Sequence, residues 1–162
     1  MKKQDLYKTP AGQLYKVKVG GNKTTDDIVR QLRANGFDCV NKIITQKNFP
    51  LEPRPIKEIE MEIIDPGRPF TEKEGLVFLK NAGLKRPTLE HAIYFTEQCG
   101  TKTNGKYVVF LHEHWLATDS RRDLDNNFVL YLNRKSETFN MVNPKNGFGD
   151  ECVLAGVRRA IK

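Results

Sequence analysis

Apolar residues recur along the chain with two different periods, and each period predicts a type of element. From Tyr15 to Val19, apolar positions alternate with Lys16 and Lys18, which is typical of a strand with one buried and one cationic face. Residues 56–64 alternate in the same way, but their solvent face is acidic. Because opposite charges attract across neighbouring strands, we expect these two strands to pair, which gives the lysines a structural role.

Three helices are predicted from their capping residues and apolar stripes, over about residues 25–35, 71–82 and 87–99. The clearest signal is the capping box formed by Thr71 and Glu74, in which each side chain meets the backbone of the other. The connection between the last two helices is short, so we expect them to form a helical hairpin.

The remaining apolar runs predict strands. Residues 107–111 are almost continuously apolar, as in a strand buried on both faces. Residues 128–132 and 137–142 flank a polar turn and predict a β-hairpin. Residues 37–45 fit a further strand, and residues 152–157 fit either a strand or a helix. The order of elements predicts an α+β fold, a mostly antiparallel sheet with about three helices packed on one face.

The length of 162 residues suits one domain, so we predict a single α+β domain over residues 1–162. Residues 1–10 are expected to be flexible, and residues 48–55 form a Pro-rich connector. No apolar segment is long enough to cross a membrane, and the basic N-terminus is not followed by an apolar leader. With three widely spaced cysteines as well, we expect reduced thiols, a cytoplasmic location and no membrane partner.

The net charge of +7 is unevenly distributed along the chain. Residues 1–23 hold six lysines and one acid, residues 24–100 are nearly neutral, and residues 101–162 are basic again. Clustered cations attract polyanions and release counterions when they bind them. The charge pattern therefore indicates nucleic acid as a partner, although lysines also serve simply to keep a surface soluble.

A second candidate site is the sequence His112-Glu113-His114, at the end of a predicted buried strand. Residues two apart in a strand point to the same side, so both imidazoles could hold one divalent metal, with Asp119, His91 or Cys152 as a third ligand. The competing interpretation is a strand end that emerges into solvent. A metal site here would make the protein a metal-dependent hydrolase or nuclease.

Three further motifs are ambiguous. The segment Gly20-Gly21-Asn22-Lys23-Thr24-Thr25 precedes a helix as a phosphate loop does, but it lacks the full glycine pattern, and an ordinary capped helix explains it. Residues 123–134 resemble a calcium loop without its glycine and final glutamate. Phe148, between two glycines, fits either a platform for stacking a base or a turn with one buried aromatic ring.

The sequence favours a non-enzymatic, basic nucleic-acid-binding protein with no cofactor. The residues predicted to contact nucleic acid are Lys16, Lys18, Lys23, Arg121, Arg122, Arg158, Arg159 and Phe148. The first alternative is a metal-dependent hydrolase built on His112 and His114, with Asp119 as a further ligand. The second is a protein-interaction or assembly module, which nothing in the sequence excludes.

Overall fold

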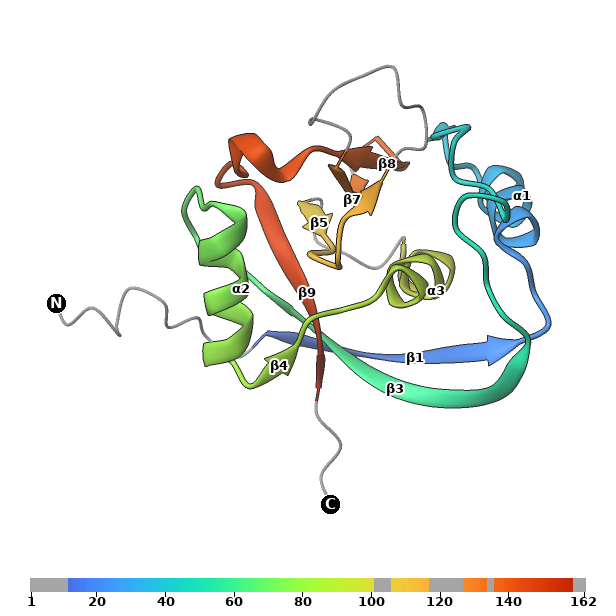
Figure 1. Ribbon diagram of the computed structural model, residues 1–162, viewed down its shortest axis with the longest axis horizontal. Coiled ribbons are helices and arrows are strands. Elements are labelled where there is room, and N and C mark those ends of the chain that lie inside the picture. The colour runs from blue at the N-terminus through green and yellow to red at the C-terminus, as the bar shows by residue number, and fades with distance from the viewer. Residues whose placement is uncertain (1–11, 101–105, 117–126, 134–135, 159–162) are drawn as a thin grey trace, which may run out of the picture.

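The strands of the protein form one curled sheet with helices on both of its faces (Figure 1). The computed structural model describes residues 12–100, 106–116, 127–133 and 136–158. The elements, in chain order, are β1 (Gln13–Gly21), α1 (Thr25–Ala34), β2 (Cys39–Val40), β3 (Arg54–Ile64), α2 (Glu72–Asn81), β4 (Leu84–Lys85), α3 (Leu89–Cys99), β5 (Tyr107–Val109), β6 (Trp115–Leu116), β7 (Asn127–Asn133), β8 (Thr138–Val142), a short 3₁₀ helix (Pro144–Asn146) and β9 (Cys152–Arg158).

The main sheet has the strand order β1-β3-β9-β5-β7-β8-β2, with β4 added beside β9 and β6 beside β7. The pairs β5–β9 and β2–β8 are parallel, and the other pairs are antiparallel. The architecture is therefore α+β, and the sheet is mixed. The ambiguous segment 152–157 becomes the central strand β9, which is buried along almost its whole length.

The helices lie on both faces of the sheet, so the prediction that they share one face is wrong. Along β9, Val153 and Ala155 face the core that α1 and α3 cover, whereas Leu154 faces a second core beneath α2. The predicted helical hairpin is also wrong, because β4 intervenes between α2 and α3. It pairs with β9, and the chain then crosses to the other face (Figure 1).

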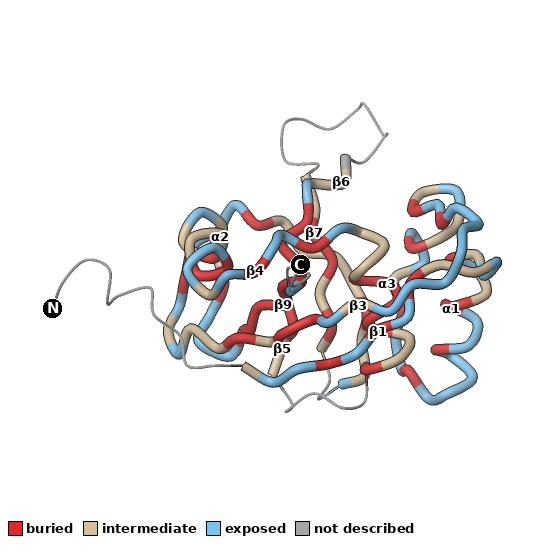
Figure 2. Tube along the Cα trace, turned by 90° about the horizontal axis from the view of Figure 1, so that it is seen from below, coloured by how far each residue is buried: buried red, intermediate tan, exposed pale blue. Residues whose placement is uncertain are grey.

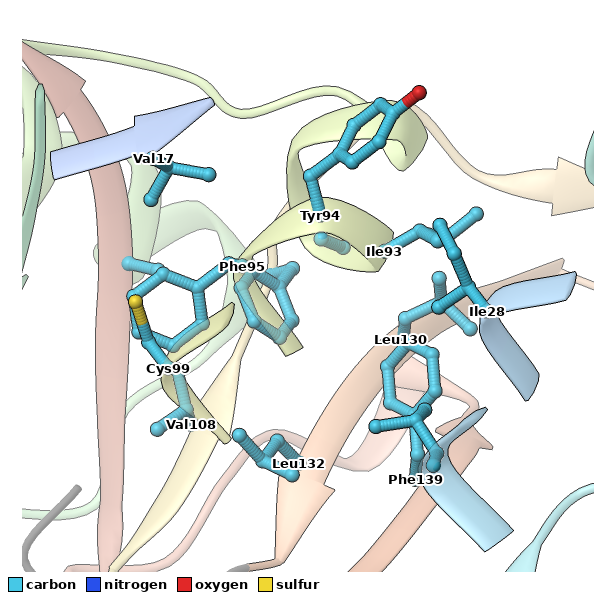
Figure 3. Close-up of a cluster of buried hydrophobic side chains, with 14 of the residues drawn as sticks. Val17, Ile28, Ile93, Tyr94, Phe95, Cys99, Val108, Leu130, Leu132 and Phe139 are labelled. Carbon is cyan, nitrogen blue, oxygen red and sulfur yellow. The ribbon is translucent and has the colours of Figure 1, made fainter. Parts of the chain in front are cut away.

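The larger core lies between the sheet and the two helices α1 and α3 (Figure 3). Phe95 of α3 makes edge-to-face contacts with Tyr15 of β1 and Phe110, with ring centroids 5.2 and 5.6 Å apart. Such contacts add to the burial of apolar area, which is the main source of stability. Tyr94 lies at the rim of this core, and Figure 3 shows its hydroxyl group pointing away from the cluster.

The three predicted helices are confirmed, and each begins with a capping box. Thr24, Thr71 and Thr88 accept hydrogen bonds from backbone N–H groups of the first turn, which would otherwise lack partners. In α3 the reciprocal acceptor is an imidazole, because the N–H of Thr88 donates to Nδ1 of His91 over 3.0 Å. The exposed residues of α1 form its outer side, coloured pale blue in Figure 2.

The segment between α1 and β3 differs from the prediction. Only Cys39–Val40 pairs as a strand, and the expected strand over residues 37–45 is otherwise coil. The Pro-rich connector contains two buried side chains, Phe49 and Leu51, and its last two residues already belong to β3. Residues 1–10, predicted to be flexible, lie outside the described residues. Among the residues described, no helix is both long and apolar enough to span a membrane.

Candidate functional site

The predicted pairing of the lysine-bearing strand with the acidic strand is confirmed. Lys16 of β1 lies opposite Glu60 of β3, and Lys18 lies opposite Glu58. The N–H and C=O groups of Lys18 point to the free edge of the sheet, where the carboxamide of Gln98 bonds both, over 2.8 and 2.7 Å. The two pairs are therefore of the non-hydrogen-bonded type, in which facing side chains lie closest.

Arg158 lies on the other side of the same acidic strand. Its Nη1 is 4.0 Å from Oε1 of Glu62, whose side chain is almost completely buried. We call this surface the charged face; it comprises Lys16, Lys18, Glu58, Glu60, Glu62 and Arg158. Three cations and three carboxylates balance there, so these residues do not form the single basic face that the sequence predicted. Arg121, Arg122 and Arg159, the other predicted contacts, lie outside the described residues.

Lys23 lies apart from the charged face, beside a cavity of about 440 Å³ that we call the turn pocket. The pocket is enclosed by the end of β1, the turn that follows it, one residue of β3, and helices α1 and α3. Its polar lining residues are Lys18, Asn22, Lys23, Gln31, Glu97 and Gln98. The fold thus brings two predicted lysines together with three carboxamides that sequence reasoning missed.

Two glycines allow the chain to turn at this pocket. Gly20 and Gly21 have φ angles of 104° and 92°, a region that other residues rarely adopt. A Cβ atom at Gly20 would also lie 2.5 Å from the carbonyl oxygen of Pro55 in β3, so a side chain does not fit. The hydroxyl of Tyr94 donates a hydrogen bond to the carbonyl of Gly20 over 3.1 Å and fixes the turn against α3.

Charged side chains of both signs surround the turn pocket. Nζ of Lys23 is 2.7 Å from Oε2 of Glu97, whose side chain is 7% exposed. The neighbouring His91 has a pKa lowered to about 4, chiefly by burial and further by the positive charges of Arg54 and Lys57. Lys57 makes no ion pair with a carboxylate of the described residues. Lys57 is therefore a cation of this end that no described carboxylate neutralises by direct contact.

The start of α1 is a capped helix rather than a phosphate loop. The N–H of Thr24 donates to Asp27, and the N–H of Asp27 donates back to the hydroxyl of Thr24. The N–H of Thr25 donates to Oε1 of Gln46 over 2.7 Å. Since the chain itself occupies these donors, the end of the helix offers little to an outside phosphate. Any anion in this region is held by side chains of the turn pocket.

The two candidate metal ligands at the end of β5 do not converge. His112 is buried; its Nδ1–H donates to the carbonyl of Glu113 over 2.6 Å, and its Nε2 accepts from the N–H of Leu130 over 2.9 Å. Burial is the first cause that lowers the pKa of His112 to about 4, so the ring is neutral. With both nitrogens occupied by backbone groups, this ring positions β7 and leaves no lone pair for a metal.

His114 lies at the surface and meets a different partner. Its Nε2 is 2.5 Å from Oε2 of Glu72 at the start of α2, and a guanidinium nitrogen of Arg86 is 3.9 Å from the same oxygen. Among the described residues, no cluster of three histidine, cysteine, aspartate or glutamate side chains could hold a metal. Asp119 lies outside the described residues, and the metal-dependent hydrolase stays a prediction.

Phe148 is a core residue rather than an open stacking platform. Its side chain is 8% exposed, and its ring centroid is 5.3 Å from that of Phe70. The two residues also exchange backbone hydrogen bonds of 3.0 and 2.8 Å in an isolated bridge. The alternative interpretation, a turn with one buried aromatic ring, is the one that the structure supports.

The chain was compared with protein-family models, with curated proteins and with solved structures, and none of them matches it. The function of the protein is therefore inferred from the geometry of the turn pocket and the charged face.

Proposed function

We propose that the protein binds nucleic acid without catalysing a reaction on it, and that the turn pocket receives a backbone phosphate. The observation that carries the proposal is the meeting of Lys18 and Lys23 with Asn22, Gln31 and Gln98 around one cavity. Ammonium and carboxamide N–H groups are common donors to phosphate oxygens, and such contacts give affinity without reading the base sequence.

The charged groups around the pocket limit how tightly an anion is held. The cations of this end are Lys18, Lys23, Arg54 and Lys57, and the carboxylates are Glu58, Glu90 and Glu97, with Asp26 and Asp27 at the start of α1. Glu97 already holds Lys23, so an entering phosphate would share this ammonium group with the carboxylate. The carboxamides of Asn22 and Gln31 would donate further N–H groups to the phosphate oxygens, whereas Nε2 of Gln98 already donates to the carbonyl of Lys18 and to Glu97.

The small number of cations sets the expected strength of binding. Two or three phosphate contacts correspond to a slope of about −2 in a plot of log affinity against log salt concentration. We therefore expect weak binding that is lost at physiological salt unless basic residues outside the described part of the chain contribute. Duplex and single-stranded probes both carry the phosphates that this pocket would recognise.

The test is fluorescence anisotropy with a labelled oligonucleotide at low and at moderate salt. The double variant Lys18→Ala/Lys23→Ala should lower affinity about tenfold, which corresponds to two charged contacts. The matched control is Lys16→Ala/Lys80→Ala, which removes the same charge at two exposed lysines away from the pocket and should change affinity less than about twofold. Absence of binding at low salt, or an equal loss in both double variants, would contradict the proposal.

A further inference from the structure

A second cavity lies on the opposite face of the sheet from α1 and α3. It has a volume of about 250 Å³ and lies between β5, β7, β8 and the segment that leads into β9. We call it the tyrosine pocket; its lining includes Tyr107, Tyr131, Val142, Phe148, Glu151 and Cys152. It shares no lining residue with the turn pocket, so the two cavities are separate features of the molecule.

Neighbouring strands supply the aromatic walls of the tyrosine pocket. Tyr131 of β7 pairs with Val109 of β5, two residues from Tyr107, so both tyrosines project from the same face. Their ring centroids are 6.1 Å apart with planes at 62°, and Phe148 adds a third ring that Phe70 holds in place. Both tyrosines are only half-buried. A flat ligand would meet one ring face to face and another edge to face, the two favoured aromatic geometries.

The volume of the tyrosine pocket limits the size of the ligand that it can hold. Pockets for drug-sized molecules usually measure about 300–1,000 Å³, so this one suits a single fused ring system rather than a larger molecule. Val109 and Val142 make the remaining surface apolar, and Gly147 and Gly149 leave the rim without bulky side chains. A compact aromatic ring fills such a space more completely than a flexible chain does.

The charges at the rim distinguish between neutral and anionic ligands. The pKa of the Cys152 thiol is raised, first by burial and then by the negative charges of Glu151 and Asp150. Burial also raises the pKa of Tyr131, whose hydroxyl lies beside the side chain of Asn140. Glu151, which lines the pocket, would repel a phosphate and could accept a hydrogen bond from a ring N–H or amino group.

We propose that the tyrosine pocket binds a small, uncharged, planar heteroaromatic molecule of the size of a nucleobase. The two tyrosine rings contact its face and its edge above the buried ring of Phe148, and Glu151 at the rim accepts hydrogen bonds from its N–H groups and disfavours anionic derivatives. This site goes beyond the proposed function, because it takes a free small molecule at a place distinct from the turn pocket.

The experiment measures binding of adenosine and guanosine, and of their 5′-monophosphates, by saturation-transfer NMR on the full chain. At least one nucleoside should bind, and its monophosphate should bind several-fold more weakly because like charges repel at the rim. Binding of neither nucleoside at millimolar concentration would overturn the proposal. Tighter binding of the monophosphates would also overturn it.

Two variants locate the binding. Tyr131→Ala removes a ring wall, and Tyr131→Phe is the control that keeps the ring. Gly149→Leu narrows the pocket by a different route: its backbone is outside the left-handed region, and an added Cβ meets only the flexible side chain of Glu151 at 3.6 Å. Tyr131→Ala and Gly149→Leu should each weaken nucleoside binding at least tenfold, whereas Tyr131→Phe should retain most of it. If Tyr131→Ala does not fold, Gly149→Leu alone decides, and unchanged binding in it contradicts the proposal.

Discussion

The charged face and the turn pocket both carry lysines that the sequence marks as candidates for binding, but the fold places them differently. On the charged face, Lys16 lies opposite Glu60 in a regular pairing that the strand register imposes. At the turn pocket, Lys23 lies where the chain leaves the sheet, beside a cavity lined by neutral carboxamides. A lysine that faces a carboxylate in a strand pair has a structural role, whereas a lysine beside a cavity is available to a ligand. The neighbouring groups that the fold provides, rather than the residue type, decide between these roles.

The largest effect on stability is expected at His112, because both of its ring nitrogens bond to backbone groups and its role is therefore structural. The variant His112→Ala should lower the free energy of unfolding by about 3 kcal/mol, because it leaves a buried N–H of β7 without an acceptor and creates a cavity. Urea unfolding measures this. Glu113→Ala, at the exposed neighbour, is the control and should change stability by less than about 0.5 kcal/mol. A tolerated His112→Ala would return this histidine to the list of candidate functional groups.

The pH dependence of stability gives the next largest effect. The pKa of His112 is about 4 in the folded protein and near 6.5 in the unfolded chain, so the unfolded chain binds the proton more tightly. The stabilisation is complete above about pH 6.5 and is lost as pH falls towards 4. Between pH 7 and 4.5 the free energy of unfolding should fall by about 2 kcal/mol through this residue alone. Denaturation with urea at several pH values measures it, and His112→Asn should reduce the slope.

Reversing the acidic row should weaken the charged face. Glu58→Lys/Glu60→Lys places like charges opposite Lys18 and Lys16 and should lower the free energy of unfolding by about 1 kcal/mol. It should also raise the nucleic-acid affinity of this face. Adding Lys16→Glu and Lys18→Glu to the same chain restores opposite charges and should recover most of the stability. Without that recovery, the pairs would not be interacting as the register implies.

The smallest effect is expected at the turn pocket. Glu97→Gln removes the carboxylate that holds Lys23 but keeps a similar shape, so the ammonium group becomes available to an entering phosphate. Oligonucleotide affinity at low salt should rise about threefold, or about 0.6 kcal/mol, which anisotropy can resolve. Glu52→Gln, at an exposed glutamate, supplies the control for the change in net charge. A decrease in affinity would mean that Glu97 itself orders the site.

Much of the fold follows from local signals in the sequence. The capping box at Thr71 and a capping threonine before the first apolar stripe predicted two helices, and the alternation of lysine with apolar residues in β1 indicated its acidic partner. The placement of α2 and α3 could not be predicted in this way. It depends on β4, two residues long, whose partner β9 lies about seventy residues further along the chain. A segment of two residues carries too little sequence information to predict its partner strand.

The candidate site was only partly predictable for a similar reason. Lys18 and Lys23 stood out by charge, but Gln31, Glu97 and Gln98 are ordinary polar residues whose helical sequence pattern does not mark them as pocket residues. Their role arises when α3 packs across the free edge of β1, which is a tertiary event. A weak signal was present in the adjacent glycines, because such a pair after a strand indicates that the chain turns sharply beside another element.

The position of β9 has a consequence for how the molecule assembles. This strand joins β3 on one side to β5 on the other, although it is made by residues 152–158. Without these residues, β3 and β5 would each lose a neighbour and have a bare edge, and bare edges are prone to pair with other chains. Because this contact joins distant parts of the chain, we expect folding to be slow and sensitive to truncation.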